Sequence, residues 1–291
     1  MSMNKLRKPE WLRANRLGNE HANKIRQHLS KYNLHTVCNS AMCPNQGECF
    51  NRGTATFMIL GDVCTRNCRF CAVEKNMPLL PPDPLEPLHI AELSNELKLK
   101  HIVITTVTRD DLPDGGASQF VKVLDAIRKK CLKSVTTETL ISDLEGNWDA
   151  LKTIIEAKPT VLNHNVETIE RLYPEVRPMA DYYRSLELLK RVKEINPEII
   201  TKSGLMVGLG ESVEEVKKLL RDLYEHQVQV VTIGQYLQPS REHIPVKEYI
   251  HPDIFEEYRR YGEELGFIFV ESGPLVRSSY HAERIQQYIT K

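Results

Sequence analysis

The stretch "GDVCTRNCRFCAV" (residues 61–73) carries three cysteines within eight positions, Cys64, Cys68 and Cys71. It follows the short apolar run "ATFMILG" (55–61), which has the length of a buried strand. In a dinucleotide-binding fold the loop after the first strand carries a G-x-G-x-x-G motif, and here it carries cysteines instead. The sequence therefore argues against that fold and for a metal centre at this position.

Downstream of this loop, helical and β-branched segments alternate regularly. Strands are expected at 101–107, 134–141, 160–166, 199–209, 228–237 and 267–273, and helices at 88–100, 117–130, 147–157, 181–195, 212–226 and 253–265. Counted from residue 55, this makes six βα units and a seventh short strand. Such alternation predicts a mostly parallel sheet, either an open doubly wound sheet or part of a barrel.

Polar clusters at the ends of the expected strands favour the barrel. They are "TRDD" (108–111), "TET" (137–139), "NHN" (163–165), "KSG" (202–204) and "GQY" (234–236). Barrel enzymes build their sites at the carboxyl ends of several strands, although loops are often polar for other reasons. We predict an α/β fold: a partial (β/α)6 TIM-type barrel over 55–274, after a cysteine-rich extension (1–54) and before a tail (275–291).

The overall composition is that of a globular protein without a membrane or nucleic-acid role. The 291 residues include 39 Lys plus Arg and 39 Asp plus Glu, which argues against a broadly basic nucleic-acid binder. No apolar run approaches the roughly 18 residues of a membrane-spanning helix. A helix is expected at 16–34, and "MSMNKLRKPEWLRANR" (1–16) lacks the apolar core of a secretory signal. We expect a cytoplasmic protein.

The crowding of six of the seven cysteines into residues 38–71 points to metal rather than to disulfides, since the chain is large and has no secretory signal. Cys64, Cys68 and Cys71 have C-x3-C-x2-C spacing, with no fourth cysteine nearby. Structural zinc needs a fourth ligand. A four-iron cluster is usually held by four thiolates, so three would leave one iron open to a substrate or cofactor.

A second triad lies upstream. Cys38, Cys43 and Cys49 have C-x4-C-x5-C spacing, and again no fourth cysteine is available, because Cys131 belongs to a different βα unit. His35 could complete a Cys3His zinc site, and a surface histidine is its ordinary alternative.

The aromatic Phe70 immediately before Cys71 makes the first triad similar to the signature of the radical S-adenosylmethionine (SAM) superfamily. The upstream C-x4-C-x5-C and the C-terminal "VRSSYHAE" (276–283) together resemble, within that superfamily, the lipoyl synthase family. The resemblance runs from about residue 35 to residue 284 and includes "TFMILGDVCTRNCRFC", "NHNVET", "TKSGLMVGLGE" and "GQYLQPS".

This resemblance implies two four-iron clusters, with SAM binding the open iron of the first. It implies that Cys64, Cys68 and Cys71 hold the first cluster, and that Cys38, Cys43, Cys49 and Ser279 hold an auxiliary cluster whose sulfides are consumed. An alkoxide suits iron less well than a thiolate does, so the Ser279 corner should open most easily. The implied reaction inserts two sulfur atoms at C6 and C8 of a protein-bound octanoyl-lysine.

Further cofactor contacts implied by the resemblance are mostly hydrogen-bonding groups at strand ends. They are Phe70; Glu138, Lys202 and Arg177 at the ribose and methionine end of SAM; Asn163 and Asn165 where substrate and cofactor meet; and Gln235 and Tyr236 beside the adenine. Structural ion pairs on the rim are the alternative for Arg177 and Lys202.

The implied partners are an octanoylated lipoyl carrier domain, H-protein or peptide, an electron donor such as ferredoxin or flavodoxin, and a carrier protein that repairs the auxiliary cluster. Two rival hypotheses stay open from the sequence. One is another radical enzyme, of the biotin-synthase or methylthio-transferring kind, which would lack the upstream triad paired with RSSY. The other is a non-catalytic scaffold with two structural zincs, which would be colourless and contain no iron.

Overall fold

The structure is a computed structural model, and it describes residues 7–12, 28–29, 31–32, 34–37, 45, 48–49, 52–75 and 79–289. Two predicted cluster ligands, Cys38 and Cys43, lie outside the described residues, as does most of the helix expected at 16–34.

The centre of the molecule is an eight-stranded sheet with the order β1-β2-β5-β6-β7-β8-β9-β10. Seven strands are parallel, and β1 pairs with β2 in the antiparallel sense. The strands are β1 (His35–Thr36), β2 (Thr54–Ile59), β5 (His101–Thr106), β6 (Thr136–Leu140), β7 (Val161–Asn163), β8 (Ile200–Val207), β9 (Val230–Gln235) and β10 (Phe269–Gly273). Every residue of β2 and of β9 is buried, as expected for parallel strands covered on both faces.

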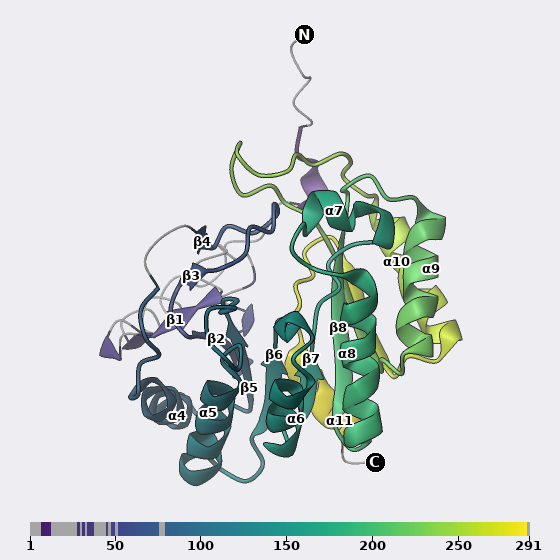
Figure 1. Ribbon diagram of the computed structural model, residues 1–291. Helices are drawn as coiled ribbons and strands as arrows, with labels where there is room; N and C mark the ends of the chain where they lie inside the picture. Colours follow the sequence, from purple (N-terminus) through teal and green to yellow (C-terminus); the bar gives the residue numbers. More distant parts are fainter. Residues whose placement is uncertain are drawn as a thin grey trace.

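Six helices lie on the outside of these strands (Figure 1). They are α4 (Glu86–Glu96), α5 (Ala117–Lys130), α6 (Trp148–Glu156), α8 (Tyr182–Ile195), α9 (Val213–Glu225) and α10 (Pro252–Leu265). Helix α9 begins where a capping box satisfies its first amides: the Ser212 side chain accepts from Glu215 N, and the Glu215 side chain accepts from Ser212 N. None of the helices in the described part of the chain is long and apolar enough to cross a bilayer.

The predicted α/β fold of alternating strands and helices is confirmed, with strands shorter than the sequence predicted. The strand expected at 160–166 ends at Asn163, because the next residues turn away toward β8: His164 N bonds to Lys202 O, and Glu167 takes a positive φ of 66°. The short helix α7 (Tyr173–Val176), which the pattern did not predict, follows this turn. The proposed boundaries after residues 54 and 274 stay predictions; β10 ends at Gly273.

The C-terminal tail passes from one end of the barrel to the other. At the carboxyl ends of the strands, Ser278 bonds to Asn163, the last residue of β7, and to Asn165, which follows β7. At the opposite end, Ile285 packs with Val161, Ile200 and Val230, the first residues of three strands. The tail finishes there in η4 (Ala282–Ile285) and α11 (Gln286–Ile289), far from β3 (Val63–Cys64) and β4 (Glu74–Lys75) (Figure 1).

Between these two ends of the barrel, the tail contacts the first and the last strand of the parallel sheet, β2 and β10. Glu283 accepts a hydrogen bond from Thr54 of β2 (3.0 Å), and Glu271 of β10 is paired with Arg284 (3.4 Å) and His281 (3.1 Å). Strands β2 and β10 are not neighbours in the sheet order. The tail therefore fills the lateral gap that an incomplete barrel leaves open.

We expect Ile285→Ala to lower the free energy of unfolding by about 2–5 kcal/mol, because Ile285 is 2% exposed and its truncation leaves a cavity beneath the strands. Urea unfolding of the apo-protein measures this. Leu132→Ala is the matched control, since Leu132 is 75% exposed and its truncation should change stability by no more than about 0.5 kcal/mol. Equal midpoints for the two variants would contradict the packing of the tail.

Candidate active site

A cavity of about 550 Å³ lies over the carboxyl ends of the parallel strands and is bordered by the first predicted ligand set and by two members of the second. Its wall includes Cys64, Cys68 and Cys71 from the loop after β2, together with Cys49 and Ser279. Three separate parts of the chain thus meet around one space.

The loop that carries the first triad begins with a sharp turn. Leu60 and Gly61 both have positive φ, 67° and 88°. The carboxylate of Glu86 accepts from Leu60 N (3.2 Å), and Arg109 Nη1 donates to Leu60 O (3.1 Å). Two buried charged side chains therefore hold a strained residue where the strand ends.

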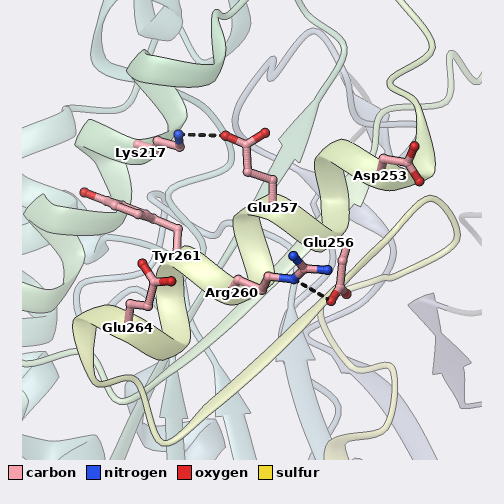
Figure 2. Close-up of a pocket in the computed structure, with 7 residues that line it drawn as sticks. All are labelled: Lys217, Asp253, Glu256, Glu257, Arg260, Tyr261 and Glu264. Atoms are coloured by element: carbon pink, nitrogen blue, oxygen red, sulfur yellow. Dashed lines mark hydrogen bonds and ion pairs between the residues drawn. The ribbon is translucent and has the colours of Figure 1, made fainter.

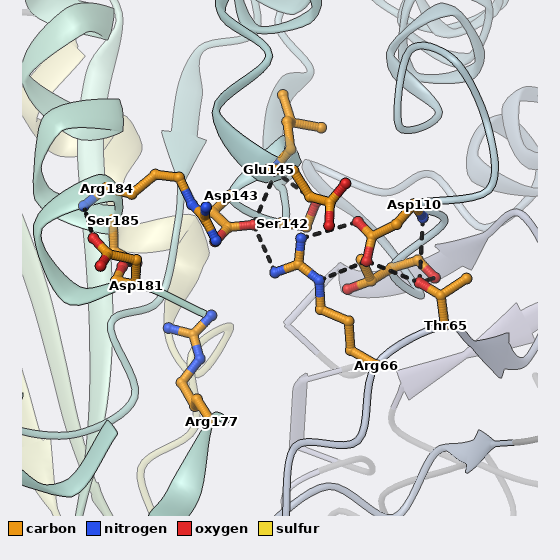
Figure 3. Close-up of polar contacts among 12 residues, drawn as sticks. Thr65, Arg66, Asp110, Ser142, Asp143, Glu145, Arg177, Asp181, Arg184 and Ser185 are labelled. Atoms are coloured by element: carbon orange, nitrogen blue, oxygen red, sulfur yellow. Dashed lines mark hydrogen bonds and ion pairs between the residues drawn. The ribbon is translucent and has the colours of Figure 1, made fainter. Parts of the chain in front are cut away.

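The same loop is anchored at its centre by Arg66, which lies between Cys64 and Cys68 and is 3% exposed. Its guanidinium bonds to both carboxylate oxygens of Asp110, at 2.7 and 2.9 Å, and pairs with Asp143 at 2.6 Å (Figure 3). Asp110 follows β5 and Asp143 follows β6, so one side chain ties the loop to the ends of two neighbouring strands.

The electrostatics of this anchor favour the charged form of Asp143. Burial by itself would raise the pKa of Asp143, but the positive charge of Arg66 overcomes this and lowers the pKa to about 2. Arg184 pairs with the same carboxylate at 2.7 Å. The anchor is therefore ionised at any ordinary pH.

The three thiols of the loop are free, and those of Cys64 and Cys68 are close enough to Cys71 to affect its ionisation. Burial raises the pKa of Cys68, and it raises the pKa of Cys71 to about 11. Iron binds thiolates, so assembly of a cluster here would displace these protons. Within the described ranges, no three His, Cys, Asp or Glu side chains converge on a single metal ion.

Of the second triad, the structure describes Cys49 alone. The segment that carries it is joined to the C-terminal tail: Asn45 Nδ2 donates to Leu275 O (2.7 Å), and Tyr280 OH donates to Glu48 Oε2 (3.1 Å). These bonds join parts of the chain 230 and 232 residues apart and place Ser279 beside the neighbourhood of Cys49.

Five of the eight predicted cofactor contacts lie in the cavity wall: Phe70, Asn165, Arg177, Gln235 and Tyr236. The last two use their polar groups to hold a nearby loop. Gln235 Oε1 accepts from Ile250 N (2.9 Å), and Tyr236 OH donates to Ile244 O (2.7 Å).

Arg177 retains a donor that faces no partner. Its Nη1 donates to Asn165 O and to Tyr173 OH, at 2.9 and 3.1 Å. Its Nε is buried and has no hydrogen-bond partner among the described residues. An orphaned guanidinium nitrogen in a cavity wall fits a ligand with an acceptor group, such as the carboxylate of an amino-acid cofactor.

The other three predicted contacts, Glu138, Asn163 and Lys202, lie beneath the cavity inside the barrel. Lys202 Nζ is 2.9 and 3.0 Å from the two Glu138 oxygens, and Asn163 Nδ2 donates to Glu138 at 2.8 Å. Burial would raise the pKa of Glu138, but the charge of Lys202 overcomes it and lowers the pKa to about 2. Lys202 is thus in an ion pair as the sequence alternative held, although in the interior and not on the rim. Contact of these three residues with the cofactor stays a prediction.

Sequence reasoning missed Arg66, Asp110, Asp143 and Glu167 as individual site residues. Glu167 lies in the wall and accepts from Asn165 Nδ2 (3.1 Å), and burial raises its pKa. A charged residue inside the cysteine motif was the available signal for Arg66. The polar cluster at 108–111 was the signal for its partner Asp110.

A second hollow, of about 470 Å³, lies on the outer face of α9 and α10 (Figure 2). It contains two ion pairs, Lys217 with Glu257 at 2.7 Å and Arg260 with Glu256 at 3.1 Å, and two further carboxylates, those of Asp253 and Glu264. It contains no cysteine and has no connection with the cavity at the strand ends.

Comparison with known proteins agrees with this geometry. The profile of the radical SAM superfamily matches residues 58–223. Among solved structures, methylornithine synthase has a TM-score of 0.59 at 14% identity, with 86% of this chain and 81% of that one covered. Coproporphyrinogen III oxidase from Escherichia coli has a TM-score of 0.52 at 16% identity, with 81% and 58% covered. Fold and site define a radical SAM enzyme.

Relatives with curated names identify the family within this superfamily. The lipoyl synthase of Caldanaerobacter subterraneus subsp. tengcongensis is 57% identical over 278 residues, 96% of each chain. That of Caldicellulosiruptor bescii is 52% identical over 288 residues, 99% of this chain and 98% of the relative. The chain belongs to the lipoyl synthase family. Its cofactors are SAM, the four-iron cluster that binds it, and an auxiliary cluster.

The Arg66 anchor makes stability depend on pH through Asp143. The folded pKa of about 2 lies below the usual 3.8, so the stabilisation is present above pH 3.8 and is lost as the pH falls toward 2. Asp143→Asn should therefore have a free energy of unfolding at least ~2 kcal/mol lower than that of wild type near neutral pH. This difference should become smaller as the pH falls.

Urea unfolding of the apo-protein at several pH values measures the difference. Glu145→Gln, at an exposed neighbouring carboxylate, is the matched control and should follow the wild-type profile. A difference between Asp143→Asn and wild type that does not vary with pH would contradict the ionised anchor.

Proposed function

We propose that this lipoyl synthase inserts sulfur at C6 and C8 of a protein-bound octanoyl-lysine, with Cys64, Cys68 and Cys71 holding the SAM-binding cluster. In this proposal Cys38, Cys43 and Cys49, with Ser279, hold the auxiliary cluster. When bound, the first cluster and SAM supply radical chemistry and the auxiliary cluster supplies the sulfur atoms. Family membership carries the reaction class.

The observation that supports this arrangement is that one cavity borders members of both ligand sets. An alkyl chain must be held where hydrogen is removed and where sulfur is delivered, so the two sites must share one space. The loop after β2 contributes Cys64, Cys68 and Cys71 to the wall of this cavity. The N-terminal part of the chain contributes Cys49, and the C-terminal tail contributes Ser279.

The chain's own residues would position the substrate and exclude water. An octanoyl chain has no polar group for recognition beyond its amide, so apolar side chains must hold it. Val37, Met58, Leu205 and Val276 are such side chains in the wall. Radicals react with whatever is near, and a dry, close-fitting wall restricts them to the intended carbons.

Arg177 and Glu167 are suited to the charged end of SAM. They carry opposite charges in the same part of the wall, and both act electrostatically on Cys68. The carboxylate of an amino acid would accept hydrogen bonds from Arg177, and its amino group would donate to Glu167. Phe70, Asn165, Gln235 and Tyr236 stay predicted contacts for the rest of the cofactor, and Glu138, Asn163 and Lys202 stay predicted contacts from below.

The family's reaction needs a protein-bound octanoyl substrate and a reductant. The finer assignments stay predictions: an octanoylated lipoyl carrier domain or H-protein as substrate, ferredoxin or flavodoxin as electron donor, a carrier protein for cluster repair, and a cytoplasmic location. The zinc-scaffold alternative has no support from the family. It would be tested by metal content, since two four-iron clusters amount to about eight irons per chain.

The two cysteine sets should fail differently when a ligand is removed. We expect Cys68→Ala to abolish cleavage of SAM, because the first cluster loses a thiolate, and to leave the auxiliary cluster in place. We expect Cys49→Ala to continue forming 5′-deoxyadenosine from SAM without producing any thiolated product.

Anaerobic reconstitution followed by mass analysis of an octanoylated carrier peptide and of 5′-deoxyadenosine measures both. Cys131→Ala is the control, since Cys131 lies at the end of α5 outside the cavity wall. Continued 5′-deoxyadenosine formation by Cys68→Ala, or thiolated product in normal yield from Cys49→Ala, would refute the respective assignment.

Ser279→Ala should weaken the auxiliary cluster alone. A chelator challenge should reduce iron from about eight toward about four per chain, whereas Ser272→Ala should keep the full content. Ser272 is a half-buried serine of β10 whose hydroxyl donates to Phe255 O (2.8 Å) outside the cavity. The nearby His281 is a poor substitute ligand, because its ring lies 3.1 Å from Glu271 and 3.5 Å from Glu48. Full iron retention by Ser279→Ala would exclude it as a ligand.

A further inference from the structure

A chain of hydrogen bonds leads from the interior of the barrel to the C-terminal motif. Lys202 is paired with Glu138, and Asn163 Nδ2 donates both to Glu138 Oε1 (2.8 Å) and to Ser278 Oγ (3.0 Å). Ser278 Oγ then donates to Asn165 Oδ1 (3.1 Å). The bonds connect β6, the end of β7, β8 and the tail.

The direction of these bonds is determined by the ionised Glu138 at the inner end of the chain. The ionised carboxylate of Glu138 can only accept, so Asn163 must present its amide nitrogen. The same nitrogen donates to Ser278, which leaves the Ser278 hydrogen for Asn165 Oδ1. Asn165 in turn presents its nitrogen to Glu167 Oε1 (3.1 Å). Ser278 is therefore held as donor and as acceptor in one orientation.

Two glycines make room for this arrangement. A Cβ built on Gly204 of β8 would lie 2.8 Å from Asn165 Oδ1, the atom that accepts from Ser278. A Cβ on Gly234 of β9 would collide with the carbonyl oxygen of Val276, two residues before Ser278. A side chain at position 204 would displace Asn165, and one at position 234 would push the tail away from the strands.

A turn links the orientation of Ser278 to that of the next residue, Ser279. Tyr280 N donates to Arg277 O (2.8 Å), which closes a four-residue turn with Ser278 and Ser279 at its centre. Within such a turn the direction of one side chain constrains that of its neighbour. Ser278 faces Asn163 and Asn165 at the end of β7, and Ser279 lines the cavity that Cys49 also borders.

We propose that Ser278 is a positioning residue: its bonds to Asn163 and Asn165 hold the turn so that Ser279 presents its hydroxyl to the auxiliary cluster. This rests on the proposed function, in which Ser279 is a ligand. Ser278 lies in the wall of the same cavity, and in this proposal it acts through Ser279 and is not itself a ligand. Its loss would leave an orphaned donor on Asn163 and an orphaned acceptor on Asn165, and would release the turn.

The test is the rate at which the auxiliary cluster loses iron to a chelator. The full-length chain with Cys64, Cys68 and Cys71 all replaced by Ala is reconstituted, so that only this cluster forms. In that background we expect Ser278→Ala to lose iron about tenfold faster than the same background with Ser278 intact, the equivalent of ~1.4 kcal/mol. Ser278→Thr, which keeps the hydroxyl, should restore the slow rate, and Ser272→Ala is the matched control.

A companion background, with Cys38, Cys43 and Cys49 replaced by Ala, retains only the SAM-binding cluster. There Ser278→Ala should leave the rate of iron loss unchanged, whereas general destabilisation of the protein would increase it. If Ser278→Ala does not fold, Asn163→Ala removes the same bond from the other partner and is read in the same way.

Ser279→Ala separates the two proposals. If it accelerates iron loss and Ser278→Ala does not, the positioning role of Ser278 is wrong and the ligand role of Ser279 stands. If neither variant accelerates iron loss, Ser279 is not a ligand and both proposals fail. Equal acceleration in both backgrounds would also overturn the positioning role.

Discussion

The cysteine loop stays over the strand ends because one buried guanidinium, that of Arg66, bonds to two carboxylates from neighbouring units of the barrel. Burying a charge is costly unless it is paired and hydrogen-bonded, and here the bidentate bond to Asp110 and the ion pair with Asp143 supply the compensation. Removing one member of such a buried pair typically costs about 3–5 kcal/mol. The loop therefore has little freedom to place its thiols elsewhere.

The C-terminal tail closes the open side of the same barrel. Seven parallel strands in an open order leave a lateral gap, and exposed strand edges invite unwanted pairing. Residues 276–289 fill this gap from the carboxyl end, where Ser278 is bonded, to the opposite end, where Ile285 is buried. The segment that completes the fold is thus the segment that carries Ser279, so closure of the barrel and construction of the site depend on the same contacts.

The site contains two kinds of ionisable group, buried ion pairs and buried thiols. Glu138 with Lys202 and Arg66 with Asp143 are buried, paired and ionised, and they build the scaffold. The thiols of Cys68 and Cys71 are held as neutral groups by burial and become ligands only when a metal replaces their protons. Scaffold charges are permanent, whereas those of the ligands appear with the cofactor.

The sequence by itself determined the alternation of strands and helices, the two cysteine triads and the family, because hydrophobic period and cysteine spacing are local properties of the chain. It could also place most site residues at strand ends, since parallel strands bring their carboxyl ends together. Only the tertiary structure decided that Arg66 bonds to Asp110 and Asp143, that Glu138 and Lys202 pair beneath the cavity, and that the tail joins the segment of Asn45 and Glu48. Such contacts between distant residues depend on which faces meet after folding, and neither period nor spacing records that.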